Sequence, residues 1–490
     1  MIKRLLIAFF WCGSLMAQTP DTVTFYSIGG IGEDVGRAIY PTQDKGYILS
    51  GTTESFGRGS TDIYIVKLDS LYQIEFSQTY GGSNIDYATD VIQLPDKSYL
   101  VTGYSNSFNP NGDYDGYLLK IDSSGNKIFE KTFGTANWDF IYAIQKNPYG
   151  EVVVCGESFD VEGKKNQAYA VCFNTSGQKL WEKHYGSANG NEVFYDVALN
   201  YRKNFLLAGS TDGFNALGKD VFMIEINQMG DSLQGFVIHD TLDQEAYCIQ
   251  ESPYDSSWVM GGYAISTVTQ SDSNEYILKF KDGSVLWKFQ YDYAPGTHDF
   301  VTDAVALPNG DFYFVGYTNT SFYMPHITAY RVNRDGYPYL AENLRVHYPA
   351  GKTQYTPKIA LHHDSAFAVL AHSSFYSSNF NDFLFIPLKR PYSVIERDTV
   401  VYLENIITRT YNIPDDSPED ILQIKDSQII LTRKADKVSI YDISGKKIME
   451  DCAVNPFYPL QISEIQTTGI YLIDIQQGDI HYLRKWYYSR

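Results

Sequence analysis

Few features of this 490-residue chain point to a catalytic or metal centre. It has five cysteines and nine histidines, no Cys-x-x-Cys pair, and no histidine placed for a zinc site. It also lacks Gly-x-Ser-x-Gly and His-Glu-x-x-His motifs, a phosphate loop and a dinucleotide fingerprint. We therefore assign no catalytic residue, metal ligand or cofactor, and the sequence favours a protein that is not an enzyme. Cys155 and Cys172 fall on consecutive predicted strands, so the pair can form a disulfide or remain as two free thiols, and the sequence leaves both alternatives open.

Long apolar runs are also scarce. The one near the start, Leu5–Trp11, follows Lys3 and Arg4 and precedes the small residue Ala17, as in a secretory signal peptide. It is too short to span a bilayer. We expect residues 1–17 to be a signal peptide and the mature chain to be secreted, to the cell surface or beyond, without spanning a membrane.

Positive charge is in the minority. The chain has 39 Lys and Arg against 58 Asp and Glu, and loss of residues 1–17 leaves 37 basic residues and a net charge of −21. A surface this negative repels nucleic acid, so no nucleic-acid partner is expected.

Helical periodicity is absent, and a repeat of about 53 residues takes its place. Each unit is anchored by a small residue that closes a short apolar run: Gly51, Gly103, Gly156, Gly209, Gly262, Gly316 and Ala371. In the second unit, residues 88–94, 98–104, 115–122 and 127–133 alternate with turn residues, which predicts a four-stranded antiparallel sheet. We predict an all-β fold, a seven-bladed β-propeller over residues 18–390, with the strand 24–29 completing the last blade.

The sequence pattern of these units resembles a repeat family of secreted bacterial propellers. The shared pattern comprises Tyr80-Gly81-Gly82, an Asp a few residues on (Asp86), and an Asp-x-Gly-Tyr turn (Asp44–Tyr47). An Asp-led strand that ends Lys67-Leu68-Asp69 belongs to it as well. The resemblance covers residues 24 to about 388 and implies the propeller fold, but propellers host many unrelated activities.

After a linker, residues 391–418, the repeat gives way to a different module at 419–490. Its motifs resemble the C-terminal sorting domain of the type IX secretion system of Bacteroidetes, an Ig-like β-sandwich. They are a Tyr-Asp-x-x-Gly-Lys hairpin, a Gly-x-Tyr strand and a basic residue near the terminus: Tyr441, Asp442, Gly445, Lys446, Gly469, Tyr471 and Lys485. The resemblance implies that the type IX machinery is a partner that reads this domain.

Two repeated residue types are candidate ligand contacts. An acid recurs 17 residues before each anchor, with Gln354 in the seventh unit: Asp34, Asp86, Asp139, Glu192, Glu245 and Asp299. A Phe recurs in the loop after the second strand: Phe56, Phe108, Phe159, Phe214, Phe322 and Phe375. Both sets are expected at the channel mouth, where carboxylates and aromatic rings suit a cation such as calcium, a sugar or a peptide. The favoured alternative is structural: the acids accept backbone N–H bonds that join the blades, and the rings pack between them.

These features together predict an exported, non-catalytic binding module for a glycan, peptide or protein. A secreted glycan-active hydrolase or lyase and a structural component of the envelope are the alternatives.

Overall fold

The computed structural model describes residues 23–490 apart from several gaps: 161–162, 164, 241, 266–271, 292–296, 320–325, 339–343, 348–355, 363–366, 374–380, 389–397, 403–421, 426–427, 432–434, 443–446, 455–458, 462–468, 478–479 and 489–490. The predicted signal peptide lies outside the described residues. The chain divides into two compact units, Met1–Thr408 and Arg409–Arg490, and the division falls within the predicted linker. Among the described residues, no helix has the length and apolar character of a membrane span.

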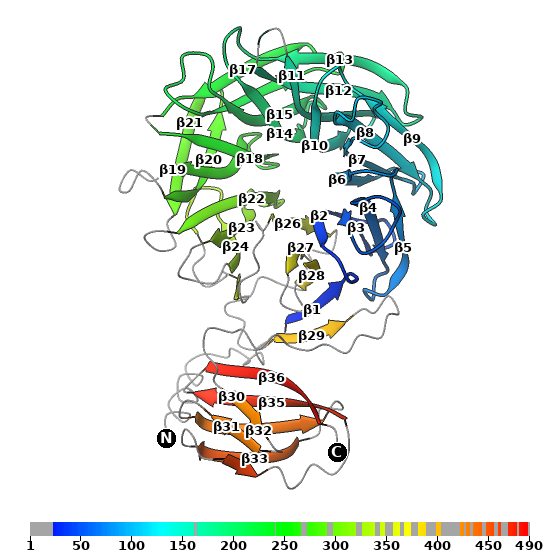
Figure 1. The fold of residues 1–490 in the computed structure, drawn as a ribbon. Helices are drawn as coiled ribbons and strands as arrows, with labels where there is room; N and C mark the ends of the chain where they lie inside the picture. Colours follow the sequence, from blue (N-terminus) through cyan, green and yellow to red (C-terminus); the bar gives the residue numbers. More distant parts are fainter. Residues whose placement is uncertain are drawn as a thin grey trace. The chain divides into compact units, whose positions relative to one another are not determined.

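The first unit is an all-β propeller, which confirms the predicted fold class (Figure 1). The first four repeats each form one four-stranded antiparallel sheet whose strands run outward from the centre in chain order (Figure 1). The next two repeats follow the same plan but are joined into one eight-stranded sheet by the parallel pairing of Ser273 with His298. The first sheet comprises β2 (Asp34–Pro41), β3 (Tyr47–Thr53), β4 (Asp62–Leu68) and β5 (Ile74–Tyr80). The second comprises β6 (Asp86–Gln93), β7 (Tyr99–Ser105), β8 (Asp115–Ile121) and β9 (Lys127–Phe133), close to the predicted bounds.

The later sheets repeat this plan. Their strands are β10 (Asp139–Lys146), β11 (Glu151–Asp160), β12 (Lys165–Asn174), β13 (Lys179–Tyr185); β14 (Glu192–Leu199), β15 (Phe205–Thr211), β16 (Asp220–Ile226), β17 (Ser232–Ile238); β18 (Gln244–Glu251), β19 (Trp258–Ile265), β20 (Ser273–Lys281), β21 (Ser284–Tyr291); and β22 (His298–Ala306), β23 (Phe312–Asn319), β24 (His326–Val332), β25 (Leu344–His347). Every anchor residue lies in the second strand of its sheet, where a Cβ on Gly103 would meet the carbonyl oxygen of Tyr87 at 1.8 Å. At the six glycine anchors, close backbone approach thus excludes a Cβ, whereas the seventh sheet has Ala371 at this position.

The last sheet joins the two ends of the repeat region. Its strands are β26 (Lys358–Leu361), β27 (Phe367–Ser373), β28 (Asp382–Leu388) and β1 (Val23–Ile28). β1 pairs antiparallel with β28, Tyr26 opposite Phe385, so the predicted closure by the N-terminal strand is confirmed. A further strand, β29 (Asp398–Tyr402), pairs in parallel with β1. The region predicted as linker therefore begins with a strand of this sheet, which the propeller boundary at 390 did not include.

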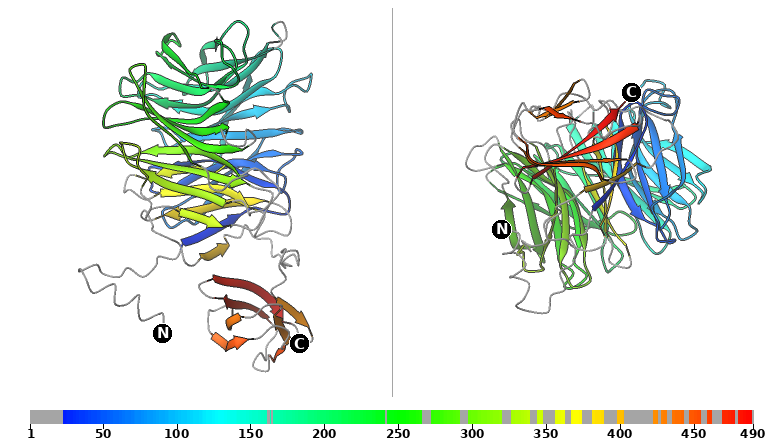
Figure 2. Two further views of the ribbon diagram at one scale, coloured as in Figure 1. Left: turned by 90° about the vertical axis from the view of Figure 1, so that its left-hand side faces the viewer. Right: turned by 90° about the horizontal axis from the view of Figure 1, so that it is seen from below.

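Apolar side chains fill the spaces between neighbouring sheets. The second and third strands are buried along most of their length, as in Tyr47–Thr53 and Asp62–Leu68, because they face a sheet on both sides. The fourth strands are more exposed, and the turns that join the strands lie at the two ends of the sheets (Figure 2). This layout leaves the first strands to surround the axis.

The second unit contains two sheets. One has the order β30 (Leu422–Lys425), β31 (Gln428–Leu431), β34 (Pro459–Gln461). The other has the order β33 (Lys447–Val454), β32 (Ala435–Asp442), β35 (Gly469–Gln477), β36 (Ile480–Tyr488). β32 and β33 form the predicted antiparallel hairpin, whose turn with Gly445 and Lys446 lies outside the described residues. The sandwich packing of the two sheets stays a prediction.

Candidate functional site: the channel and its mouth

The repeated acids stand at or beside the start of the first strands and are buried. Asp34, Asp86 and Asp139 are 0 % exposed, and the remaining three, Glu192, Glu245 and Asp299, reach 2 % at most. The Asp86 carboxylate accepts the Gly82 N–H at 2.8 Å, the Ser107 hydroxyl at 2.7 Å and the Ser105 hydroxyl. Gly82 lies in the loop arriving from the preceding sheet, so this acid joins two sheets.

The same contacts recur in other units. Asp34 accepts the Gly30 N–H at 2.5 Å and the Ser55 hydroxyl at 2.6 Å. Asp139 accepts the Thr135 N–H at 2.7 Å. Burial raises the pKa of Asp139 to about 6, although the hydrogen bond from Ser158 opposes the rise.

Glu192 keeps this pattern and Glu245 departs from it, because the strand register places Gln244 rather than Glu245 at the position equivalent to Glu192. Glu192 accepts the Ser187 N–H at 3.0 Å, but Glu245 pairs with Lys219 at 2.6 Å and accepts the Tyr263 hydroxyl at 2.9 Å. Gln354 lies outside the described residues. The bonds to loop N–H groups and hydroxyls favour the structural role of these acids, and their role as ligand contacts stays a prediction.

The loop phenylalanines pack over the third strands. Phe56 lies 5.4 Å from the Tyr64 ring, Phe108 stacks on Tyr117 at 5.9 Å, and Phe214 lies 5.5 Å from Phe222. Phe108 and Phe214 remain 43 % and 40 % exposed. These two rings therefore combine packing with an exposed face, whereas Phe322 and Phe375 lie outside the described residues.

Sequence reasoning missed the aromatic lining of the channel. The first strands carry a register shift that leaves one extra residue on the strand, for example between Phe194 and Asp196. Such a bulge changes the direction of a side chain. The extra residue is Tyr142 on β10, Tyr195 on β14 and Tyr247 on β18. The Tyr195 ring centroid lies 5.6 Å from that of Tyr142 and 5.0 Å from that of Tyr247. All three rings are half-buried, and they contact one another across three consecutive first strands.

The ring contacts continue to the next sheet. Tyr247 lies 5.8 Å from Tyr263, which lies 5.3 Å from Phe300, which stacks on Tyr317 at 4.9 Å. We call the six residues Tyr142, Tyr195, Tyr247, Tyr263, Phe300 and Tyr317 the aromatic belt. Burial raises the pKa of each of its tyrosines, that of Tyr317 to about 12, so the belt hydroxyls are protonated at neutral pH.

Carboxylates accompany the belt. Glu157 accepts the Tyr142 hydroxyl at 2.7 Å, and Glu245 accepts that of Tyr263. Burial raises the pKa of Glu157, while the hydrogen bonds from Tyr142 and Asn166 lower it. The belt thus combines π faces with two fixed glutamates.

Three aspartates follow the bulges of alternate sheets. Asp90, Asp196 and Asp303 each accept the N–H of the next residue and, at 2.8–2.9 Å, an N–H on the first strand of the following sheet. The positive charge of Lys358 lowers the pKa of all three aspartates, and its Nζ donates a hydrogen bond to the Thr302 carbonyl at 3.2 Å. Burial raises the pKa of Asp90 to about 7 and that of Asp196 to about 6. The aspartates bond backbone N–H groups at the open inner edge of the first strands.

The described residues contain neither a grouped set of metal ligands nor a disulfide bond. Within the described ranges, no three His, Cys, Asp or Glu side chains are grouped to hold a metal ion. Cys155, Cys172 and Cys248 are free and buried. Cys172 lies opposite Val153 rather than Cys155 in the strand register, so the structure contains the free thiols and not the disulfide.

Comparison with known proteins is informative at the level of fold. No family model matches the sequence, and no curated protein gives a significant match. A solved protein of unknown function from Dyadobacter fermentans is 10 % identical, with a TM-score of 0.44 and coverage of 76 % of this chain and 99 % of that one. The WD40 domain of Neurospora crassa Pan2 is 8 % identical (TM-score 0.43; 77 % and 99 % covered). The β-propeller domain of the Trilobed protease from Pyrococcus furiosus is 10 % identical (TM-score 0.41; 72 % and 94 %). At these identities the likeness concerns the propeller fold alone.

Proposed function

We propose that this chain is an exported, non-catalytic binding protein that holds a cationic side chain of a peptide or protein partner in its channel. The observation that carries the proposal is the aromatic belt, a run of rings in mutual contact, all half-buried except the buried Tyr317, beside two fixed glutamates. A cation over the face of an aromatic ring is attracted by the ring quadrupole, and more strongly where water is excluded.

Acidic groups outnumber basic groups around the belt. Glu157, Glu245 and three aspartates lie among the cations Lys358, Lys219 and Arg37. Burial nevertheless raises the pKa of Asp90 to about 7 and that of Asp196 to about 6. The excess of negative charge over the mature chain adds long-range attraction for a basic partner.

Export through the type IX system is the second element of the proposal. The register of the second unit supports it, because motif residues distant in sequence occupy neighbouring positions. Asp442 on β32 pairs with Tyr471 on β35, and Lys485 on β36 pairs with Leu472 beside it.

The binding proposal is tested with fluorescent peptides and the full-length mature chain. We would compare peptides containing Arg, Lys or trimethyl-Lys with matched peptides that carry Gln at the same position, using fluorescence anisotropy. Tyr195→Leu keeps an apolar side chain but removes the quadrupole, and it should weaken binding about 2- to 30-fold, corresponding to about 0.5–2 kcal/mol for a cation–π contact.

Tyr149→Leu is the matched control, since Tyr149 is 69 % exposed in a turn outside the belt. Equal affinity of wild type and Tyr195→Leu, or no preference for cationic peptides over the Gln peptides, would contradict the proposal.

A further inference from the structure

An aromatic contact joins the outer edges of neighbouring sheets. A fourth-strand ring covers the glycine of the next sheet's last turn: a Cβ on Gly125 would meet Phe76 at 2.9 Å, and one on Gly177 would meet Phe129 at 2.5 Å. At the next junction Trp181 lies 3.0 Å from such a Cβ on Gly230 and donates its indole N–H to the Gln228 carbonyl at 2.7 Å. We call this contact the outer latch.

The outer latch is missing between the β14–β17 and β18–β21 sheets. The fourth-strand position opposite Lys67, Lys120 and Cys172 holds Phe76, Phe129 and Trp181, but the same position opposite Glu225 holds Gln234. The receiving turn is also shorter: two residues, Asp282 and Gly283, separate the paired Lys281 and Ser284, against five in Asp122–Asn126. A Cβ on Gly283 would meet only Phe236, at 3.7 Å.

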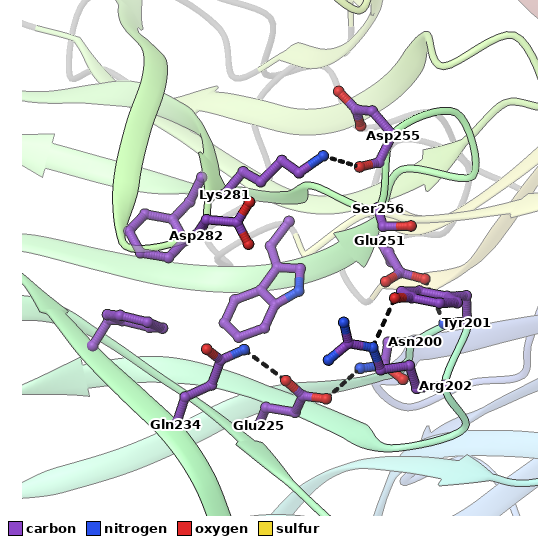
Figure 3. A pocket seen from close by; sticks show the side chains of 13 residues that line it. Asn200, Tyr201, Arg202, Glu225, Gln234, Glu251, Asp255, Ser256, Lys281 and Asp282 are labelled. Carbon is purple, nitrogen blue, oxygen red and sulfur yellow. Dashed lines mark hydrogen bonds between the residues drawn. The ribbon is translucent and has the colours of Figure 1, made fainter.

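These two changes open a pocket of about 290 Å³ at the junction (Figure 3). Its apolar surface comes from Phe236, Trp258 and Phe280, whose rings lie 4.7–6.2 Å apart. It opens among the turns between first and second strands, at the opposite end of the strands from the repeated acids. The volume is close to the lower limit for small-molecule sites.

Hydrogen bonds fix the polar groups around this pocket. The buried Glu225 carboxylate accepts amide N–H groups of Asn200 and Asn204, both at 2.7 Å, and of Gln234 at 2.6 Å. On another side, Arg202 donates to the Tyr201 hydroxyl at 2.7 Å, as Figure 3 shows. The walls thus present amides, carboxylate, phenol and guanidinium in fixed positions.

The indole of Trp258 supplies a donor that the protein does not use. This side chain is 6 % exposed, and its N–H makes no hydrogen bond with the part of the chain that the structure describes. The Trp258 N–H is not among the buried polar atoms that lack a partner, so solvent or a ligand can reach it, whereas the N–H groups of Trp181 and Trp287 bond backbone carbonyls. A hydroxyl oxygen of a ligand would accept the Trp258 N–H.

We infer that the junction pocket binds one neutral sugar residue of a glycan. A sugar ring has an apolar face that packs on aromatic rings, and its hydroxyls both donate and accept, which the mixed amide, carboxylate and guanidinium walls can satisfy. Glu225, Glu251 and Asp282 outnumber Arg202 and Lys281 around the opening, which disfavours an anionic sugar. The site is independent of the channel proposed above.

The test uses the full-length mature chain and neutral hexasaccharides of glucose, mannose, xylose and N-acetylglucosamine, with isothermal titration and tryptophan emission as readouts. The wild type should bind at least one of them with a Kd below about 5 mM and a shifted tryptophan emission. Gln234→Trp restores the aromatic residue of the other junctions and fills the pocket, so affinity should fall at least tenfold.

Gln290→Trp, on the exposed face of β21 outside the pocket lining, is the matched control and should bind as the wild type does. Tyr195→Leu should also leave sugar binding unchanged, which separates this inference from the channel proposal. Binding of none of the four oligosaccharides, equal affinity in Gln234→Trp, or preference for an acidic oligosaccharide such as oligoalginate would overturn the inference.

Discussion

Replacement of Asp86 by alanine distinguishes a structural acid from a ligand contact. The buried carboxylate accepts three hydrogen bonds, from the Gly82 N–H and the hydroxyls of Ser105 and Ser107. A hydrogen bond to a charged group contributes about 1.5–3 kcal/mol, and the two hydroxyls can rotate toward other acceptors, so we expect a loss of about 3–5 kcal/mol. At about 2 °C per kcal/mol, the lower end of the range for domains of 150–250 residues, Tm should fall by about 6–10 °C.

The assay is thermal unfolding followed by circular dichroism, together with urea titration at fixed pH. Asp335→Ala is the control, because Asp335 is exposed and its carboxylate makes no hydrogen bond to the described residues; its free energy of unfolding should change by no more than about 0.5 kcal/mol. If Asp86→Ala melts within about 1 °C of the wild type, the carboxylate does not stabilise the junction and the structural interpretation fails.

Three further outcomes are expected. Gly177→Ala should lower the free energy of unfolding, measured by urea titration, by about 1–3 kcal/mol more than Gly150→Ala does. Both glycines have positive φ, but only at Gly177 would the added Cβ meet a ring, that of Phe129. Equal losses in the two variants would refute the outer latch. Asp90→Asn should flatten the pH dependence of stability between about pH 4 and 7. The raised folded-state pKa of Asp90, about 7, means that the folded state holds the proton more tightly than the unfolded state, so wild-type stability falls as pH rises through this window; an unchanged slope would contradict this. Burial raises the pKa of the Cys155, Cys172 and Cys248 thiols, so iodoacetamide followed by peptide mapping should find no modification of these three in the native protein and full modification in urea.

The repeat made the fold predictable from sequence. Strand bounds in the second unit were predicted to within a few residues, because glycine and Asx turns punctuate short apolar segments. The closing strand was also predictable, since residues 24–29 repeat the fourth-strand pattern. The strand Asp398–Tyr402 was harder to place, because its partner β1 lies about 375 positions earlier and no local pattern indicates parallel pairing.

The candidate site was less accessible to sequence reasoning. The recurrent acids were found because they repeat, and repetition is what a junction contact produces. The signals for the channel and the pocket lie in departures from the repeat: tyrosine at one position of three consecutive units (Tyr142, Tyr195 and Tyr247), and Gln234 where other units have an aromatic ring. Both need the strand register, because a bulge or a shortened turn shifts the alignment by one residue.

The closure of the propeller also sets the order of its assembly. The Ser27 hydroxyl bonds the Asp382 carboxylate at 2.9 Å across 355 positions of sequence, whereas the other sheets draw their strands from adjacent sequence. At a synthesis rate of about 5–20 residues per second, the strand Val23–Ile28 waits about 20–70 s for its partner to be made. During that interval its backbone groups form an unprotected edge, a template for association between nascent chains. A factor that shields this strand would therefore act early, before the last repeat leaves the ribosome.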